Sequence, residues 1–273
     1  MTPPVPIRLN LFPGGLSRAL TLSYDDGVAE DRRFVSILNA HGLKGTFHIN
    51  SGTIGHGDKI AREEIAPLYK GHEVAAHSVT HPHLAALPPA ERTWEILEDR
   101  RALEALVGYP VRGMSYPFGS HSPEVVAALA AAGIEYCRTV ASHGGFHAPE
   151  QPLLWHPTLH HNHDLEKKAD EFFSPVRNGD ARLLYVWGHT YEFERTGTWD
   201  LIERFAERIG TRAAKEKDVW LATNIEVHDY LAALRSLRAS ADGRIVRNLS
   251  ALPVWITWNR EPREIPAGAT AAL

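Results

Sequence analysis

Two acidic residues stand together at the end of an apolar run near the N-terminus. The run Leu20–Tyr24 leads directly into Asp25 and Asp26, and a glycine follows. Two adjacent carboxylates repel each other unless a cation or a shared proton lies between them. One carboxylate that binds a metal and one that acts as a base would resolve this conflict. The alternative is a solvated turn, because Asp-Gly pairs are common turn formers.

Two histidines follow another short apolar run. His77 and His81 come after Glu73–Ala76 and are four residues apart. If the segment between them is one turn of helix, both rings face one way and can bind a single ion. Two histidines and one aspartate leave coordination positions open, which is typical of a catalytic rather than a structural metal site. An isolated pair of histidines at this spacing is weak evidence for a metal site, so the prediction also depends on the two aspartates.

Two further motifs also follow apolar runs. Tyr116-Pro117-Phe118-Gly119 comes after the fourth run, where proline and glycine would fix a tight loop and expose a backbone N–H. The run Leu184–Gly188 ends in His189, a position that suits a proton donor to a leaving amine. In a parallel barrel, catalytic residues lie at the carboxyl ends of the strands. We therefore expect all four motifs to meet at one end of the fold.

The elements that must position these residues alternate along the chain. Apolar runs predict strands at Leu20–Tyr24, Gly45–Ile49, Glu73–Ala76, Val111–Ser115, Ile134–Arg138, Leu183–Trp187 and Val219–Ala222. Helical patterns lie between them at Glu30–Ala40, Arg62–Tyr69, Pro89–Leu106, Pro123–Ala131, Leu165–Arg177, Trp199–Lys215 and Ile225–Ala239. This alternation predicts an α/β fold with a parallel sheet covered by helices. About seven such units favour a closed or nearly closed barrel.

We expect one barrel domain over residues 1–240 and a short C-terminal β extension over 241–273. The tail from Arg244 to Pro262 resembles a strand pair, and Leu252–Trp258 is its apolar part. Ser142–Asp164 is the longest irregular stretch, and long loops in compact domains are often functional.

Composition excludes several classes of protein. The 273 residues are 44% hydrophobic and 23% charged with a net charge of −4, which is ordinary for a globular protein, and the basic residues are scattered. We therefore expect no nucleic-acid partner.

The single cysteine, Cys137, rules out an intramolecular disulfide and fits a reducing compartment. Met1–Asn10 has no secretory apolar run and no stretch is long enough to span a bilayer, so we expect a cytoplasmic protein without a membrane partner. Oligomeric state is not indicated.

The four motifs resemble those of the polysaccharide deacetylases, also called NodB-type domains or carbohydrate esterase family four. The similarity covers roughly Leu20 to Ala239 and rests on Ser23–Gly27, His77–His81, Tyr116–Gly119 and Trp187–His189 in that order. It implies a distorted (β/α) barrel and one divalent metal, most often zinc, with cobalt, nickel, iron and manganese as alternatives.

The resemblance also implies roles for individual residues. Asp26, His77 and His81 would hold the metal, which lowers the pKa of a bound water. Asp25 would accept the proton of that water as it attacks an acetyl carbonyl, and His189 would protonate the departing amine.

The third motif would form the substrate side of the site. Tyr116, Pro117 and Phe118 would line it, and the backbone N–H of Phe118 would help to stabilise the oxyanion.

The sequence departs from the family pattern at two places. Ser115 stands where many members carry an arginine that steadies the catalytic carboxylate. Arg112 or Arg138 could supply the charge, and Arg138 is better placed because it ends a predicted strand. The family's fourth motif, an aspartate that orients the catalytic histidine, is not recognisable. In that region His160 and His161 would either approach the substrate or belong to a rigid loop.

Glu192 comes three residues after His189 and could orient it, although a surface glutamate is an equal alternative. The resulting hypothesis is a metal-dependent hydrolase that removes an acetyl group from an N-acetylated sugar or oligosaccharide. The alternatives are a hydrolase of a non-sugar amide or an O-acetyl ester on the same barrel, and a carbohydrate-binding relative that has lost catalysis.

Overall fold

A parallel sheet forms the centre of the molecule. The structure is a computed structural model that describes residues 6–175 and 180–273. Within these ranges eight strands make one sheet in the order β6-β5-β4-β3-β2-β8-β7, with β9 beside β2. The strands are β2 (Arg18–Asp25), β3 (Thr46–Ile49), β4 (Glu73–Ala76), β5 (Gly113–Ser115), β6 (Tyr136–Arg138), β7 (Leu159–His160), β8 (Arg182–His189) and β9 (Trp220–Leu221). All of their pairings are parallel, as expected.

The sheet curls until its two edges approach each other. The backbone N–H of Trp155 donates to the carbonyl of Cys137 in β6 at 2.9 Å. Only a few residues later, Leu159 and His160 pair with β8. The segment 155–160 thus links the two edges of the sheet. This confirms the predicted distorted (β/α) barrel.

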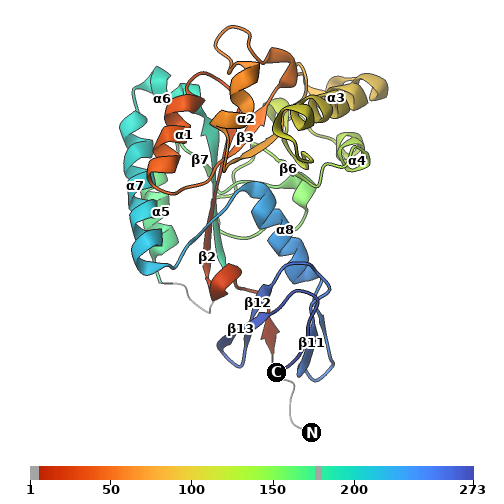
Figure 1. The fold of residues 1–273 in the computed structure, drawn as a ribbon, viewed down its shortest axis with the longest axis vertical. Coiled ribbons are helices and arrows are strands. Elements are labelled where there is room, and N and C mark those ends of the chain that lie inside the picture. Colours follow the sequence, from red (N-terminus) through yellow and green to blue (C-terminus); the bar gives the residue numbers. More distant parts are fainter. Residues whose placement is uncertain (1–5, 176–179) are drawn as a thin grey trace.

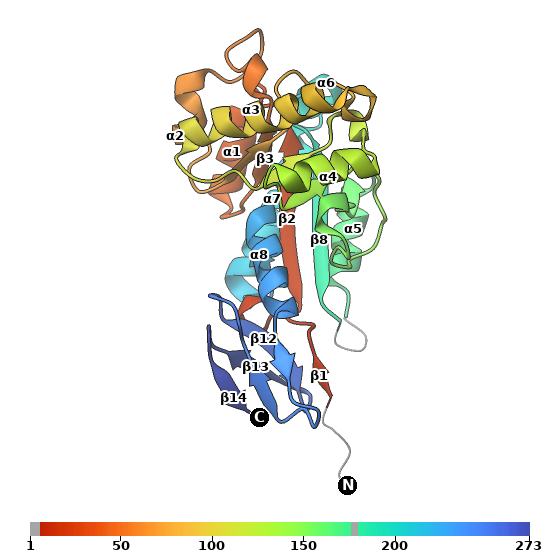
Figure 2. The same cartoon turned by 90° about the vertical axis from the view of Figure 1, so that its right-hand side faces the viewer.

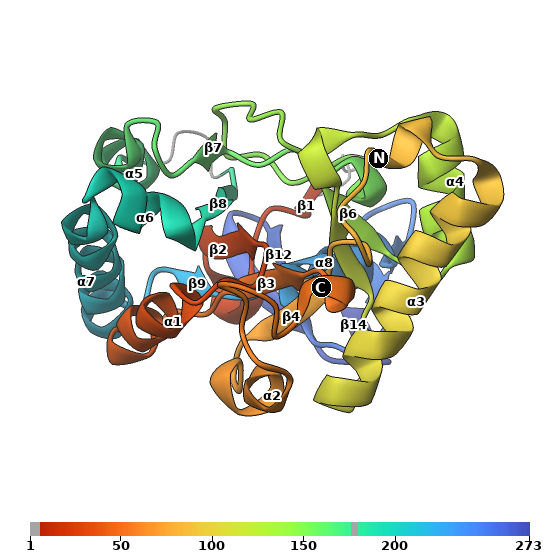
Figure 3. The same cartoon turned by 90° about the horizontal axis from the view of Figure 1, so that it is seen from above.

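Helices surround the strands (Figure 3). They are α1 (Asp31–Ala40), α2 (Ile65–Leu68), α3 (Pro89–Val107), α4 (Pro123–Ala131), α5 (Leu165–Phe173), α6 (Thr190–Thr196), α7 (Trp199–Glu216) and α8 (Asn224–Arg235). Short 3-10 turns lie at Pro13–Gly15, Ser51–Thr53, Arg62–Glu64, Leu84–Ala86, Pro117–Gly119 and Pro152–Leu154. Among the described residues, no helix has the length and apolar character needed to cross a membrane.

Helix α4 shows how local sequence sets these boundaries. The Ser122 hydroxyl accepts a hydrogen bond from the backbone N–H of Val125, which caps the helix at its start. Pro123 takes the first helical position, where its missing N–H removes no helical bond. The helix ends before Gly133, whose φ of +73° is the left-handed conformation of a helix stop.

Strand β2 separates an apolar outer layer from a polar interior. Leu20, Leu22 and Tyr24 are buried in the main apolar cluster with residues of α1, α5 and α7. The alternate residues Thr21 and Ser23 make buried polar contacts instead, because successive strand residues face opposite sides. The barrel interior is therefore a hydrogen-bonded network that leads from α8 toward the end of β2.

Two of these interior contacts fix the lower end of the barrel. The Thr21 hydroxyl donates to Asn224 at the start of α8 at 2.7 Å, and the Asn224 amide donates to the Tyr185 hydroxyl at 2.6 Å. The Glu73 carboxylate accepts hydrogen bonds from Tyr136 and Thr46 at 2.7 and 2.9 Å. Helix α8 thus closes the barrel at the end opposite the predicted site.

Two small antiparallel sheets lie beside the start of β2 (Figures 1 and 2). One has the order β1-β12-β13 and the other β10-β11-β14. Their strands are β1 (Ile7–Arg8), β10 (Arg238–Ala239), β11 (Ile245–Arg247), β12 (Val254–Trp258), β13 (Glu261–Ile265) and β14 (Thr270–Ala272). The tail is thus larger than the predicted strand pair and includes an N-terminal strand. The division into 1–240 and 241–273 stays a prediction.

Several predicted elements differ in extent. The irregular stretch Ser142–Asp164 contains β7, and α6 directly follows His189 although no helix was expected there. The last predicted helix ends at Arg235, because residues 238–239 pair with β11 instead. The helix expected over Leu165–Arg177 ends at Phe173, and its residues 176–177 lie outside the described residues.

Candidate active site

Asp26, His77 and His81 come together above the carboxyl ends of β2 and β4. The Asp26 Oδ1 atom lies 3.7 Å from Nε2 of His77 and 3.7 Å from Nε2 of His81. One ligand atom from each residue fits within a set whose members are all within 4.8 Å of one another. One carboxylate oxygen and two imidazole nitrogens are a donor set suited to a divalent cation. The described residues therefore fit the predicted metal, with positions left open for water or substrate.

The two histidines converge without a helix between them. The conditional expectation of one helical turn over 77–81 is wrong, because Ser78 and His81 have φ values of +65° and +60°. These left-handed residues fold the segment back on itself. The His77 ring is fixed by Ser115, whose hydroxyl lies 2.7 Å and whose carbonyl lies 2.9 Å from Nδ1. The opposite ring nitrogen thereby faces Asp26.

Asp25 lies beside this cluster and is almost fully buried. Its Oδ2 atom contacts the Arg138 guanidinium, and its Oδ1 atom accepts a hydrogen bond from the Ser115 hydroxyl at 3.0 Å. Burial alone would raise the pKa of Asp25, but Arg138 and the neighbouring histidines outweigh burial and hold this pKa below its usual range. Asp25 is therefore an ionised carboxylate at neutral pH.

Of the two candidate arginines, Arg138 is the one that contacts the Asp25 carboxylate. It is fully buried, its Nε donates to the Ser23 hydroxyl at 3.1 Å, and its guanidinium stacks 4.4 Å from the Trp187 ring centre. The alternative candidate, Arg112, instead pairs with Glu135 and Asp229 and does not contact Asp25. The geometry thus decides between the two arginines.

His189 lies on the other side of Asp25. Its Nε2 atom is 4.0 Å from Asp25 Oδ2, and its Nδ1 atom is 3.3 Å from Glu192 Oε1. Burial would lower the pKa of His189, but the carboxylates of Glu192 and Asp25 raise it above its usual value. A raised pKa increases the share of protonated imidazole near neutral pH. His189 can therefore carry a proton at the edge of the site.

Comparison with known proteins gives a consistent result. The polysaccharide deacetylase family model matches residues 15–137. A chitooligosaccharide deacetylase from Sinorhizobium fredii is 30% identical over 167 residues, which are 60% of this chain and 70% of that protein.

The chain belongs to the polysaccharide deacetylase family. Another chitooligosaccharide deacetylase, from Bradyrhizobium, is 30% identical over 131 residues, 47% of this chain and 58% of that protein. A protein from Mycobacterium smegmatis assigned as a polysaccharide deacetylase has a similar fold, with a TM-score of 0.60 and 17% identity over 86% of this chain and 95% of that one. A carbohydrate esterase family four pseudoenzyme from Bacillus anthracis also has a similar fold. Its TM-score is 0.53, and it is 18% identical over 80% of this chain and 66% of that one.

The residues of the third motif of this deacetylase-family chain differ in their exposure and in their distance from the Asp26–His77–His81 cluster. Pro117 is buried, and the Tyr116 side chain is also buried and donates its hydroxyl to the carbonyl of Leu153 at 2.7 Å. Phe118 is 59% exposed, and its ring lies 4.4 Å from that of His81. Its φ of +55° is left-handed, which turns the loop sharply at the rim. Phe118 is thus the third-motif side chain that lies next to the cluster.

His160, at the end of β7, and His161, directly after it, both lie close to Glu192. Both ring Nε2 atoms lie 3.1 Å from Oε2 of Glu192, the residue beside His189. The family's fourth motif is not recognisable in the sequence, yet the Glu192 carboxylate lies 3.3 Å from Nδ1 of His189.

Sequence reasoning missed the interior partner His48. It is fully buried, its Nε2 lies 2.8 Å from the Ser23 hydroxyl, and it is in register with Asp25 on the next strand. Burial lowers the pKa of His48 to about 3, so the ring is neutral. The usable signal was a histidine between Phe47 and Ile49 in the predicted strand Gly45–Ile49, because strand alternation turns it to the side opposite these apolar neighbours.

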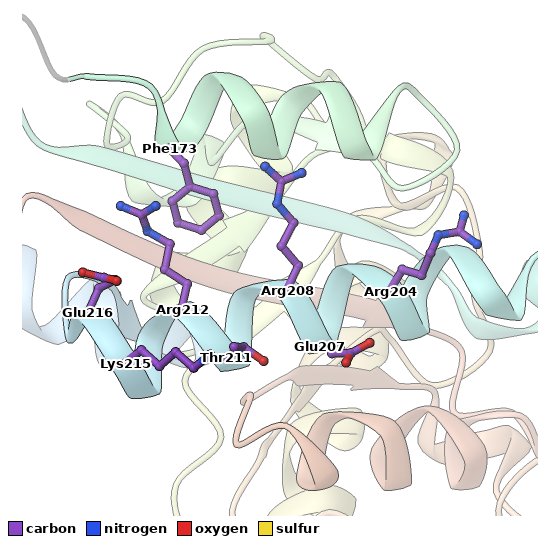
Figure 4. A pocket seen from close by; sticks show the side chains of 8 residues that line it. All are labelled: Phe173, Arg204, Glu207, Arg208, Thr211, Arg212, Lys215 and Glu216. Atoms are coloured by element: carbon purple, nitrogen blue, oxygen red, sulfur yellow. The ribbon is translucent and has the colours of Figure 1, made fainter.

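A hollow elsewhere on the surface lacks such chemistry. It runs along α7 beside Phe173 (Figure 4), and its arginines already have acidic partners. Arg208 pairs with Glu166 and Asp170, and Arg212 pairs with Asp218. The strand-end cluster is thus the better candidate for the active site of this family member.

Proposed function

We propose that this protein is a metal-dependent hydrolase that removes the acetyl group from an N-acetylated sugar or oligosaccharide. The observation that carries this proposal is the position of Asp25, whose Oδ2 atom lies 3.9 Å from His77 of the Asp26–His77–His81 cluster and 4.0 Å from His189. The relatives named above are chitooligosaccharide deacetylases, and a peptidoglycan-N-acetylglucosamine deacetylase from Listeria monocytogenes is 26% identical over 40% of the chain. The chain spans 58% of the Bradyrhizobium chitooligosaccharide deacetylase, and the substrates of these relatives are candidate substrates for this protein.

Asp26, His77 and His81 would hold one divalent cation, for which zinc is our first choice. When bound, such an ion polarises a carbonyl oxygen and lowers the pKa of water. The Ser115 contacts to His77 keep the ring in a fixed orientation, with Nε2 toward Asp26.

Asp25 would take a proton from the water that attacks the acetyl carbonyl carbon. Arg138 and Ser115 hold its two oxygen atoms, so the carboxylate is oriented before substrate arrives. Such a positioned base contributes roughly 10²–10⁴-fold to a rate.

His189 would give its proton to the amine nitrogen as the carbon–nitrogen bond breaks, leaving acetate and a free amino sugar. Oε1 of Glu192 lies 3.3 Å from the other ring nitrogen of His189. The backbone N–H of Phe118 would assist the negative charge that develops on the carbonyl oxygen.

The test is acetate release from a panel of N-acetylglucosamine, chitooligosaccharides of increasing length, peptidoglycan fragments and O-acetylated xylan. Each is measured with chelator, and again after adding single metals. Chelator-sensitive release from an N-acetylated substrate supports the proposal, and the preferred member defines the substrate class. Release from xylan alone would favour the ester alternative. No release from protein shown to hold metal would favour a non-sugar amide or a binding protein.

The cellular setting belongs to the same proposal. We expect a cytoplasmic protein with no nucleic-acid or membrane partner. Fractionation of the native host, followed by acetate-release assays on each fraction, tests this expectation.

A further inference from the structure

A second group of possible metal ligands lies behind His189. Oε2 of Glu192 is 3.1 Å from Nε2 of His160 and 3.1 Å from Nε2 of His161. One ligand atom from each of these three residues falls within a set whose members are all within 4.8 Å of one another. None of the three belongs to the Asp26–His77–His81 cluster.

The His161 ring is buried without hydrogen-bond partners. Its exposure is 0%, and in the described part of the chain neither ring nitrogen makes a hydrogen bond. Buried imidazole nitrogens are normally paired, so this ring calls for a ligand. The Glu192 oxygen is close enough to bond to Nε2 but does not do so with hydrogen-bond geometry. In a metal site the ion occupies the direction of the nitrogen lone pair, and neighbouring ligands lie beside that direction.

The surrounding residues hold His161 in this orientation. Its ring is stacked between Phe193 and Tyr24, with ring centres 4.2 and 5.6 Å away. Gly188 faces the ring on β8, where a Cβ atom would lie 2.0 Å from Nδ1 of His161. The position of His161 therefore depends on a residue without a side chain. A ring whose orientation is fixed by packing in this way is typical of a residue that binds a ligand.

We propose that His160, His161 and Glu192 form a second metal site that binds a zinc-type divalent cation. Two imidazole nitrogens and one carboxylate oxygen are a known zinc ligand set. Ligands of a tetrahedral zinc ion with bonds of about 2.0–2.1 Å lie roughly 3.3 Å apart, close to the observed 3.1 Å. With three protein ligands, the site leaves a coordination position open.

A third histidine-acid group does not compete for this assignment. Glu135, His228 and Asp229 also lie close together. However, both carboxylates are engaged by Arg112, at 2.5 Å from Glu135 and 2.6 Å from Asp229. A cation there would have to displace an arginine, whereas none of the partners of Glu192 in its cluster is a lysine or an arginine.

The test is the number of zinc ions that each folded chain retains. Metal-free protein is titrated with zinc chloride, desalted and analysed for zinc per chain. We expect two zinc ions for the wild type, one for His160→Gln and one for Asp26→Asn. The double variant should retain none. This readout is independent of acetate release, so it can fail while the proposed deacetylation holds, and the reverse is also true.

Two matched controls and a second variant sharpen the result. His163→Gln changes an exposed histidine in the same loop, and His228→Gln changes the third group; both should retain two zinc ions. Glu192→Gln keeps the side-chain size and should also retain one zinc ion. This variant replaces His160→Gln in the test if His160→Gln does not fold. A thermal unfolding transition shows that each variant is folded. The proposal is overturned if folded His160→Gln or Glu192→Gln retains as much zinc as the wild type. It is also overturned if the wild type holds one ion that Asp26→Asn removes.

Discussion

Arg138 and Asp25 form a buried ion pair in the barrel interior, away from bulk solvent. Removing one partner of such a pair leaves an uncompensated buried charge, which destabilises a protein by roughly 3–5 kcal/mol. Because Arg138 also donates to Ser23 and stacks on Trp187, it connects the site to the interior network. Its position is therefore a matter of both stability and chemistry.

We expect Arg138→Met to lower the free energy of unfolding by about 3 kcal/mol or more. Acetate release should fall at least tenfold, because the Asp25 carboxylate loses its main charged partner. Urea unfolding and the acetate assay measure the two effects. The control is Arg112→Met, which removes an arginine paired at a distance from Asp25 and should leave the activity unchanged. Equal activity of both variants would contradict the assigned role of Arg138.

Asp25 and His189 are expected to act at different points of the reaction. We predict that Asp25→Asn and His189→Ala each reduce kcat by roughly 10²–10⁴-fold, as expected for the loss of a general base or acid. Both variants should still retain zinc at the Asp26 cluster, which metal analysis checks. If either variant keeps full turnover, its role in the proposed mechanism is wrong.

Elements meet around Glu73, which begins β4 and binds residues of β3, β6 and α8. It accepts hydrogen bonds from Thr46, Tyr136 and the backbone N–H of Ile225. Burial raises the pKa of Glu73 to about 7, although these hydrogen bonds oppose the shift. The folded protein therefore binds the proton of this carboxyl group more tightly than the unfolded chain does.

This shift gives a pH dependence of stability. The contribution of Glu73 is fully present below its unfolded pKa of about 4.5 and is lost as the pH rises through about 7. The full effect is on the order of 3 kcal/mol. We expect Glu73→Gln, which resembles the protonated form, to flatten the fall in unfolding free energy between pH 5 and 8. Urea titrations across this range measure the slope, and the exposed change Glu63→Gln should leave it as in the wild type.

Local patterns predicted most strands and helices of the barrel but missed β7 and α6. The strand ends of β2 and β4 could be read from apolar runs that stop at Asp25 and His77, and the helix predicted over Pro123–Ala131 is α4 with the same bounds. Strand β7 consists of Leu159 and His160 and so has no apolar run, and α6 begins directly after β8 without an intervening loop. The turn at 77–81 depends on left-handed backbone at non-glycine residues, which is held by tertiary contacts.

The same contrast applies to the site. Residues that act through type and spacing, such as Asp26 and His77, could be found in the sequence. The contact of Arg138 with Asp25 joins residues 113 positions apart, and the neighbours of Glu192 come from the end of β7, a segment without a motif. Such contacts are set by the closure of the barrel and could only be proposed as alternatives.

At the scale of the whole molecule, the barrel and the small sheets share a core. Val254, Ile256 and Ile265 of the small sheet are buried in one cluster with Val227 and Leu234 of α8. Strand residues of the barrel, Ala19 and Leu183 among them, belong to the same cluster. A continuous core of this kind favours unfolding in one cooperative step.

We predict that Ile256→Ala lowers the unfolding free energy of the whole protein by roughly 2–5 kcal/mol, as for other large-to-small core changes. Tryptophan fluorescence and circular dichroism should report the same transition. The exposed change Ile245→Ala should shift the midpoint little. A separate early transition in the variant would show that the small sheets unfold independently of the barrel.

The ladder between β2 and β8 pairs eight residues of each strand, from Arg18 and Arg182 to Asp25 and His189. Adding or removing one residue within either strand would reverse which side chains face the interior beyond that point. The carboxylate and the imidazole would then no longer face each other across the site. Changes in chain length that preserve activity are therefore confined to the loops, or must occur at matching positions in both strands.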